Sequence, residues 1–228
     1  MYVVPPSGGL AARQRVLYLS RSMASPRYVW RDLSPAQRKQ LLAWRISRQH
    51  PWHSPPHRVL EGFRSYHISA ACYEHAPFIG HSRERMDQFA QTLFETLCDG
   101  GAAVHAWCVL PNHYHALVRT RDLPALFREL GRFHGRTSRM WNEKENIEGR
   151  QVFCRAAERA IRSERHFWAT VNYVHNNPVH HGYVKLWPEW PWSSATSFLE
   201  KVGREEAVRI WSGYPLKDYG AKWDSSDL

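Results

Sequence analysis

The sequence predicts an α+β fold: a ferredoxin-like split β-α-β sandwich, an antiparallel sheet with helices on one face, preceded by a basic N-terminal extension. The main observation is the order of segments from residue 65 onward, where strand-like and helix-like patterns alternate as β-α-β-β-α-β before a final helix. The second is size. A chain of 228 residues, 43% of them hydrophobic, can bury one core and is too apolar to be wholly disordered.

The first three strands and the first helix follow from the spacing of apolar residues. Tyr66–Tyr73 is predicted to be a strand, and Ser82–Leu97 has apolar residues three and four positions apart, as in an amphipathic helix. Ala103–Leu110 is an apolar strand, and His113–Arg119 returns after a short turn. These last two segments are expected to form a hairpin.

The second half of the domain is predicted from longer segments. Leu123–Trp141 has the pattern of a long helix, and Gln151–Ala160 is expected to be the fourth strand. Arg165–Asn176 is predicted to be a helix that Pro178 stops. From about Val202 we expect a helix and a loose tail.

The composition indicates three regions. Residues 1–60 form the extension, rich in Arg, Trp and Pro; residues 61–200 form the main domain; and residues 201–228 form a C-terminal tail. Within the extension, Ser34 precedes Pro35, and Gln37 can complete a capping box, so a helix is predicted from here to about Ser47.

Positive charge indicates a polyanionic partner, and nucleic acid is the leading expectation. Lys and Arg number 31 against 21 Asp and Glu, and residues 1–65 alone carry a net charge of +9. Basic residues on two predicted helices are candidate DNA contacts. They are Arg38, Lys39 and Arg45 in the extension, and Arg128, Arg132, Arg136 and Arg139 in the long helix. Each helix also has an interpretation without DNA. The extension could pack on the core with its arginines facing water, and the arginines of the long helix could form a solvated face.

Several classes of protein are not expected. The four cysteines are widely spread without a CxxC pair, which disfavours a disulfide framework or a structural zinc finger. No run approaches the ~18 apolar residues of a membrane-spanning helix, and the first residues lack the order of a secretory signal. We expect a cytoplasmic, nucleoid-associated protein without a membrane partner.

Two groups of residues have the composition of a catalytic site. His113 and His115 lie two apart on a strand, so both imidazoles face the same side and can share a metal ion, while Tyr114 points into packing. On the last helix, Tyr173 and Asn177 are four residues apart and away from the most apolar stripe. Each group taken alone is also compatible with a purely structural role.

Taken together, the two groups suggest attack on a phosphodiester. A metal ion held by two histidines and an amide polarises a phosphate oxygen, and the Tyr173 hydroxyl attacks phosphorus. Histidine ligands favour Mn²⁺ over Mg²⁺, although both ions are compatible with the set.

The segments WCVLPNHYHALV, HFWATVNYVHNNPVHHGYV and PEWPWSS resemble those of the single-tyrosine HUH (IS200-like) transposases, and among them the REP-associated tyrosine transposases. The resemblance covers about residues 65–198. It implies a ferredoxin-like nuclease that acts on single-stranded DNA with hairpins. It also implies that His113, His115 and Asn177 bind the metal and that Tyr173 forms a 5′-phosphotyrosine, freeing a 3′-OH. Related enzymes often have Gln where Asn177 stands.

Three other functions are alternatives to a transposase. A domesticated DNA-binding protein would recognise hairpins without cutting, and a rolling-circle initiator or relaxase would use the same chemistry, commonly with a third histidine or paired tyrosines. A metallophosphodiesterase would use water as nucleophile in place of Tyr173. Because enzymes of this superfamily complete the site within one subunit or exchange the tyrosine helix between two, a monomer and a homodimer both stay open.

Overall fold

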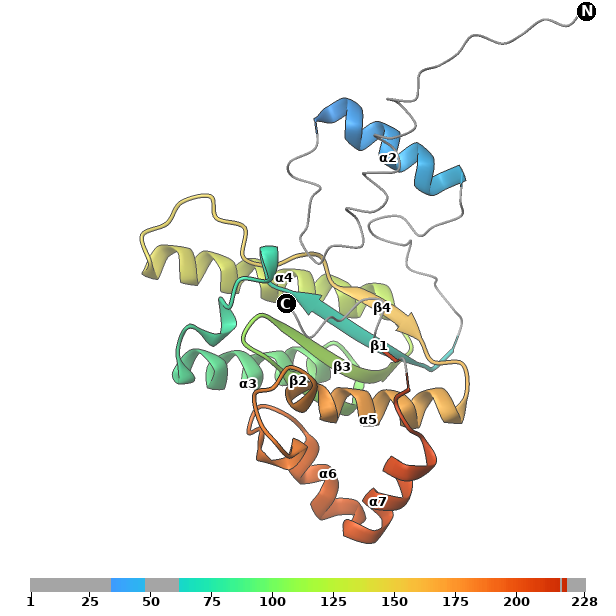
Figure 1. The fold of residues 1–228 in the computed structure, drawn as a ribbon. Coiled ribbons are helices and arrows are strands. Elements are labelled where there is room, and N and C mark those ends of the chain that lie inside the picture. The colour runs from blue at the N-terminus through green and yellow to red at the C-terminus, as the bar shows by residue number, and fades with distance from the viewer. Residues whose placement is uncertain (1–33, 48–61, 218, 221–228) are drawn as a thin grey trace, which may run out of the picture. The chain divides into compact units, whose positions relative to one another are not determined.

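The computed structural model describes residues 34–47, 62–217 and 219–220 (Figure 1). The helix α2 (Pro35–Ser47) belongs to one unit and the elements from residue 62 onward to another, and each is described by itself. In α2 the predicted capping box is confirmed. The Ser34 N–H donates to Gln37 Oε1 at 2.8 Å, and the Gln37 N–H donates to Ser34 Oγ at 3.3 Å.

The main unit is built on a four-stranded antiparallel sheet in the order β2-β3-β1-β4. Its strands are β1 (Arg64–Ala71), β2 (Ala103–Val109), β3 (His113–Thr120) and β4 (Ala157–Ala160). With a helix between β1 and β2 and another between β3 and β4, this is the predicted split β-α-β arrangement, and the fold class is confirmed.

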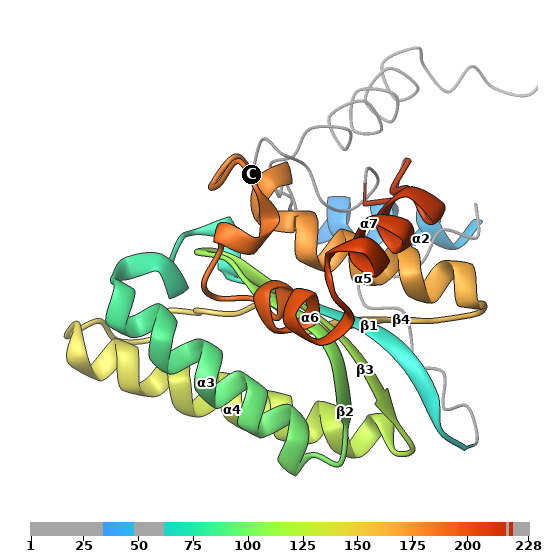
Figure 2. The ribbon, with the colours of Figure 1, turned by 90° about the horizontal axis from the view of Figure 1, so that it is seen from below.

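The two connecting helices, α3 (Arg83–Asp99) and α4 (Leu123–Lys144), lie on one face of the sheet, as predicted (Figure 2). Tyr114 of β3 points toward them, because its ring lies 6.0 Å from that of Phe89 and its hydroxyl lies 3.1 Å from His134 Nε2. Burial lowers the pKa of His134 to about 4, so its imidazole stays neutral and can accept a hydrogen bond from the Tyr114 hydroxyl.

The opposite face is covered by α5 (Glu164–His180), beside which pack α6 (Ala195–Val202) and α7 (Arg204–Gly213) (Figure 2). Helices on both faces leave the central strand β3 buried almost throughout. Because side chains alternate along a strand, the neighbours of Tyr114 in sequence point toward α5.

Two predicted boundaries are wrong. The fourth strand is only Ala157–Ala160, because upstream of it the chain bulges: three residues separate Phe153 from Ala157, while two separate their partners Cys72 and Ser69 on the neighbouring segment. The helix α5 continues through Pro178 to His180. Pro178 has no N–H to donate within the helix, and the helix nevertheless continues for two more residues.

No helix in the described ranges has the length and apolar character needed to cross a membrane.

An ion pair joins α3 to the end of α4. Glu145 accepts hydrogen bonds of 2.6 Å from both Arg85 and Arg150, and the Arg85 guanidinium lies 4.6 Å from the centre of the Trp141 ring. The bonds from Arg150 and then from Arg85 hold the pKa of Glu145 at about 2, below its ordinary 4.5.

We expect Glu145→Gln to lower the free energy of unfolding at pH 7 by about 1–3 kcal/mol, because the buried Arg85 loses its charged partner. A carboxyl with a depressed folded-state pKa stabilises the fold fully above pH 4.5, and loses that effect as the pH falls toward 2. The difference between the two proteins in urea unfolding should therefore shrink over this range. Glu129→Gln, which removes an exposed pair with Arg132, should change little.

Candidate catalytic site

The structure brings together all four residues of the two predicted groups. His113 and His115 point from β3 toward α5, and their ring centres are 5.0 Å apart. The hydroxyl of Tyr173 lies 3.3 Å from His115 Nε2, and Asn177 Oδ1 lies 3.1 Å from His113 Nε2. All four side chains are buried.

Both imidazoles are oriented through their second ring nitrogen. His113 Nδ1–H donates to Asn112 Oδ1 at 2.7 Å, and His115 Nδ1 lies 3.1 Å from Nε2 of His67 on the neighbouring strand β1. The Nε2 atoms therefore face α5. This arrangement is typical of metal-binding histidines, whose remaining nitrogen is held by a hydrogen bond.

The donor atoms fit a divalent cation. When His113 is neutral with its one ring proton on Nδ1, toward Asn112, both His113 Nε2 and Asn177 Oδ1 can offer lone pairs to a cation. Their separation of 3.1 Å is close to the roughly 3 Å between neighbouring ligands of an octahedral ion with bonds of about 2.1 Å. In the described part of the chain, no group of three His, Cys, Asp or Glu side chains that could hold a metal ion is found.

A short C-terminal segment covers the tyrosine. Tyr173 is 3% exposed, and the ring of Tyr219 lies 5.0 Å from its ring. At Gly220, with φ of +100°, an added Cβ would lie 2.6 Å from Tyr173 Cε2, so only glycine fits. Tyr219 and Gly220 therefore close the Tyr173 ring off from solvent.

Tyr219 is held by the same stripe of α5 that carries the tyrosine. The Arg162 N–H donates to His166 Nδ1, so His166 Nε2–H can donate to the Tyr219 hydroxyl at 3.4 Å. That hydroxyl lies 2.7 Å from Thr170 Oγ1, which itself donates to the His166 carbonyl. Burial raises the pKa of Tyr219, so this phenol stays protonated and can complete the chain.

The predicted DNA contacts do not gather at this site. Arg128, Arg132, Arg136 and Arg139 are all exposed on α4, which lies on the face of the sheet opposite Tyr173. Lys39 is exposed on α2, in the other unit; the side chains of Arg38 and Arg45 lie outside the described ones.

Two arginines that were not among the predicted DNA contacts lie nearer to the candidate site. Arg159 is paired with His67 across β4 and β1, so both side chains lie on the same face of the sheet. The positive charges of Arg159 and Arg162 add to burial in lowering the pKa of His166, and so lie close to the Tyr219 cover.

Comparison with known proteins supports the family resemblance. No family model matches the chain. It is 29% identical over 129 residues to a Haemophilus influenzae protein named as a REP-associated tyrosine transposase, covering 48% of this chain and 66% of the relative. It is 26% identical over 171 residues to the Escherichia coli REP-associated tyrosine transposase, covering 70% and 94% respectively.

A solved structure of a REP-associated tyrosine transposase bound to a REP hairpin has the same fold. It matches with a TM-score of 0.50 and 19% identity, over 64% of this chain and 84% of that one. The two homologues confirm the predicted resemblance to the REP-associated tyrosine transposases, and the solved structure confirms the fold.

Proposed function

We propose that the chain is a metal-dependent endonuclease and strand transferase acting on single-stranded DNA with hairpin-forming repeats. The observation that carries this proposal is the position of Tyr173, whose hydroxyl lies 3.3 Å from one histidine of the pair while Asn177 lies 3.1 Å from the other. The names of the relatives and the REP hairpin bound by one of them support DNA as the substrate.

In this reaction the chain exchanges one phosphate ester for another. The Tyr173 oxygen forms a bond to phosphorus, the bond from phosphorus to the 3′ oxygen breaks, and that oxygen leaves as a hydroxyl with the proton given up by the phenol. A Mn²⁺ or Mg²⁺ ion, held by His113, His115 and Asn177, would polarise the phosphate. His115 orients the phenol oxygen in the resting structure.

A second candidate is a DNA-binding protein that recognises hairpins without cutting them. The cover formed by Tyr219 and Gly220 favours it, because a buried phenol cannot reach phosphorus. The two candidate functions differ in whether a covalent protein–DNA adduct forms.

The nucleophile is tested with single-stranded hairpin oligonucleotides drawn from the gene's own flanking repeats, with Mn²⁺ or Mg²⁺. On a denaturing gel we expect a metal-dependent protein–DNA adduct, which Tyr173→Phe abolishes because the attacking oxygen is gone. Tyr183→Phe, which removes a half-exposed phenol beyond the end of α5, is the control and should retain the adduct. Hairpin binding without adduct under both metals would favour the non-cutting protein, and cleavage that survives in Tyr173→Phe would indicate water as nucleophile.

His67 is expected to act as a positioning residue for the metal. Replacing it with Phe removes the hydrogen bond that orients His115, and should lower Mn²⁺ affinity by about 10–100-fold in isothermal titration calorimetry. His67→Gln, which keeps a polar partner, should recover part of this loss. His134→Phe removes a buried histidine on the opposite face and should leave Mn²⁺ affinity unchanged; an equal loss in that variant would mean a general effect on the fold.

Arg159 is expected to contact a DNA phosphate near the Tyr219 cover. The logarithm of the affinity for a single-stranded hairpin DNA is plotted against the logarithm of the salt concentration. Arg159→Ala should make the slope of this line less steep by about 0.7, which is the contribution of one phosphate contact. Arg128→Ala on α4 tests the predicted DNA contacts on the other face of the sheet. If only Arg128→Ala changes the slope, DNA binds over α4 and the assignment of Arg159 is wrong.

A further inference from the structure

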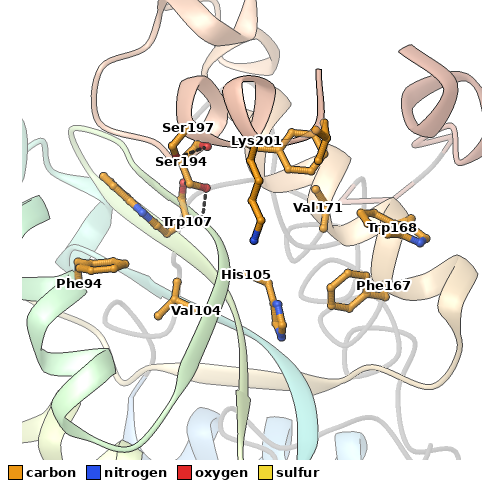
Figure 3. A pocket seen from close by; sticks show the side chains of 12 residues that line it. Phe94, Val104, His105, Trp107, Phe167, Trp168, Val171, Ser194, Ser197 and Lys201 are labelled. Carbon is orange, nitrogen blue, oxygen red and sulfur yellow. Dashed lines mark hydrogen bonds between the residues drawn. The ribbon is translucent and has the colours of Figure 1, made fainter. Parts of the chain in front are cut away.

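A second concave site lies on the other flank of α5. It is a cavity of about 450 Å³ between the edge strand β2, α5 and α6 (Figure 3). The volume is within the range of about 300–1,000 Å³ typical of sites for small organic groups. Phe167 and Val171 face this cavity, whereas Tyr173 and Asn177 face the histidines, so α5 is a wall common to both sites.

The lining combines aromatic rings with a positive charge. Trp107, Phe167 and Trp168 are each half-buried, and the ring of His105 meets that of Phe167 edge to face at 5.1 Å. Figure 3 shows the side chain of Lys201 reaching from α6 into the space between these rings. The lining contains no carboxylate. Flat apolar surfaces beside one ammonium group suit an anion that carries a planar ring.

The walls are fixed to one another by Ser194. Its hydroxyl accepts a hydrogen bond of 2.9 Å from the Trp107 N–H and lies 2.9 Å from Nε2 of His175 on α5. Strand β2, helix α5 and the start of α6 therefore meet at one side chain. A cavity held in this way is formed before a ligand arrives, which lowers the entropy lost on binding.

A peptide that adds a strand to β2 fits this place poorly. The edge of β2 is already hydrogen-bonded by the segment before α6: the Val109 N–H donates to the Trp192 carbonyl at 2.8 Å, and the Ser194 N–H donates to the Trp107 carbonyl at 2.9 Å. Strand addition needs these backbone groups.

We propose that the cavity holds an unpaired nucleotide of the DNA strand that continues from the hairpin, with its base against Trp168 and Phe167 and its phosphate at Lys201. This inference rests on the proposed function. Proteins bind single strands by stacking bases on aromatic side chains beside basic groups. Because α5 is only about 10 Å wide, a strand of a few nucleotides can reach both the cavity and Tyr173.

The test uses the full chain carrying Tyr173→Phe, so that the DNA is bound without cleavage. Hairpins with a single-stranded tail are prepared with one abasic site at each tail position in turn, and affinity is measured by fluorescence anisotropy. At one position, loss of the base should weaken binding about five- to tenfold. Trp168→Ala should abolish this difference, and Lys201→Gln should weaken binding of the tailed hairpin while leaving the tailless hairpin unchanged.

Two matched variants serve as controls. Trp211→Ala removes a partly exposed tryptophan of α7, and Lys144→Gln removes an exposed lysine at the end of α4. Both should keep the affinity and the base dependence of the unsubstituted chain. Equal binding of every abasic DNA, or base dependence that survives in Trp168→Ala, would refute the assignment of the cavity as a nucleotide site. Neither result would bear on hairpin binding or adduct formation. Absence of hairpin binding in this test, together with absence of adduct in the chain that keeps Tyr173, would overturn the proposed function and this inference with it.

Discussion

The packing of α5 on the sheet is the contact on which the candidate site depends. Its residues come from segments more than fifty positions apart, and only this packing brings Tyr173 to His115 and Asn177 to His113. The apolar residues Val171 and Val174, both buried, hold the helix down. A change in packing at these valines would be transmitted to the four residues of the candidate site, because close-packed cores transmit strain.

The segment that follows α5 locks this contact in place. Trp190 Nε1–H donates to the Val109 carbonyl at 2.8 Å, so the chain after the helix is tied to β2 through a side chain as well as through backbone bonds. In addition, His175 on α5 meets Ser194 at 2.9 Å. The PEWPWSS segment, selected in the sequence for its resemblance to transposases, therefore has a structural role, because it fixes α5 against the edge of the sheet.

Strand β3 serves both faces of the sheet because its side chains alternate. Tyr114 and its neighbours on the same side contribute to the core under α3 and α4, while His113 and His115 face α5. A strand buried on both faces can hold polar groups only where they find partners. Asn112 and His67 supply these partners, which explains how two imidazoles are kept inside a hydrophobic domain.

Much of this arrangement was predictable because it follows from local patterns. The period of two along His113 and His115, and the spacing of four between Tyr173 and Asn177, are properties of one strand and one helix. His67 was not selected, because its position opposite His115 depends on the pairing of β1 with β3, which one sequence does not give. The bulge before β4 and the passage of α5 through Pro178 were missed for a related reason: tertiary contacts outweighed the local preference.

The cover over Tyr173 had no signal in the sequence, and it bears most directly on how the site can work. Tyr219 is anchored on Thr170 and His166, one turn and two turns before Tyr173, so the cover is fastened to the helix that carries Tyr173 itself. Its two hydrogen bonds to these residues and its ring contact with Tyr173 contribute about 1.5–4.5 kcal/mol in total. An opening of that cost leaves roughly 0.05–7% of molecules uncovered. A substrate that binds only the uncovered form loses apparent affinity by the same fraction, so DNA that also contacts surfaces away from Tyr173 has the means to compensate for opening the cover.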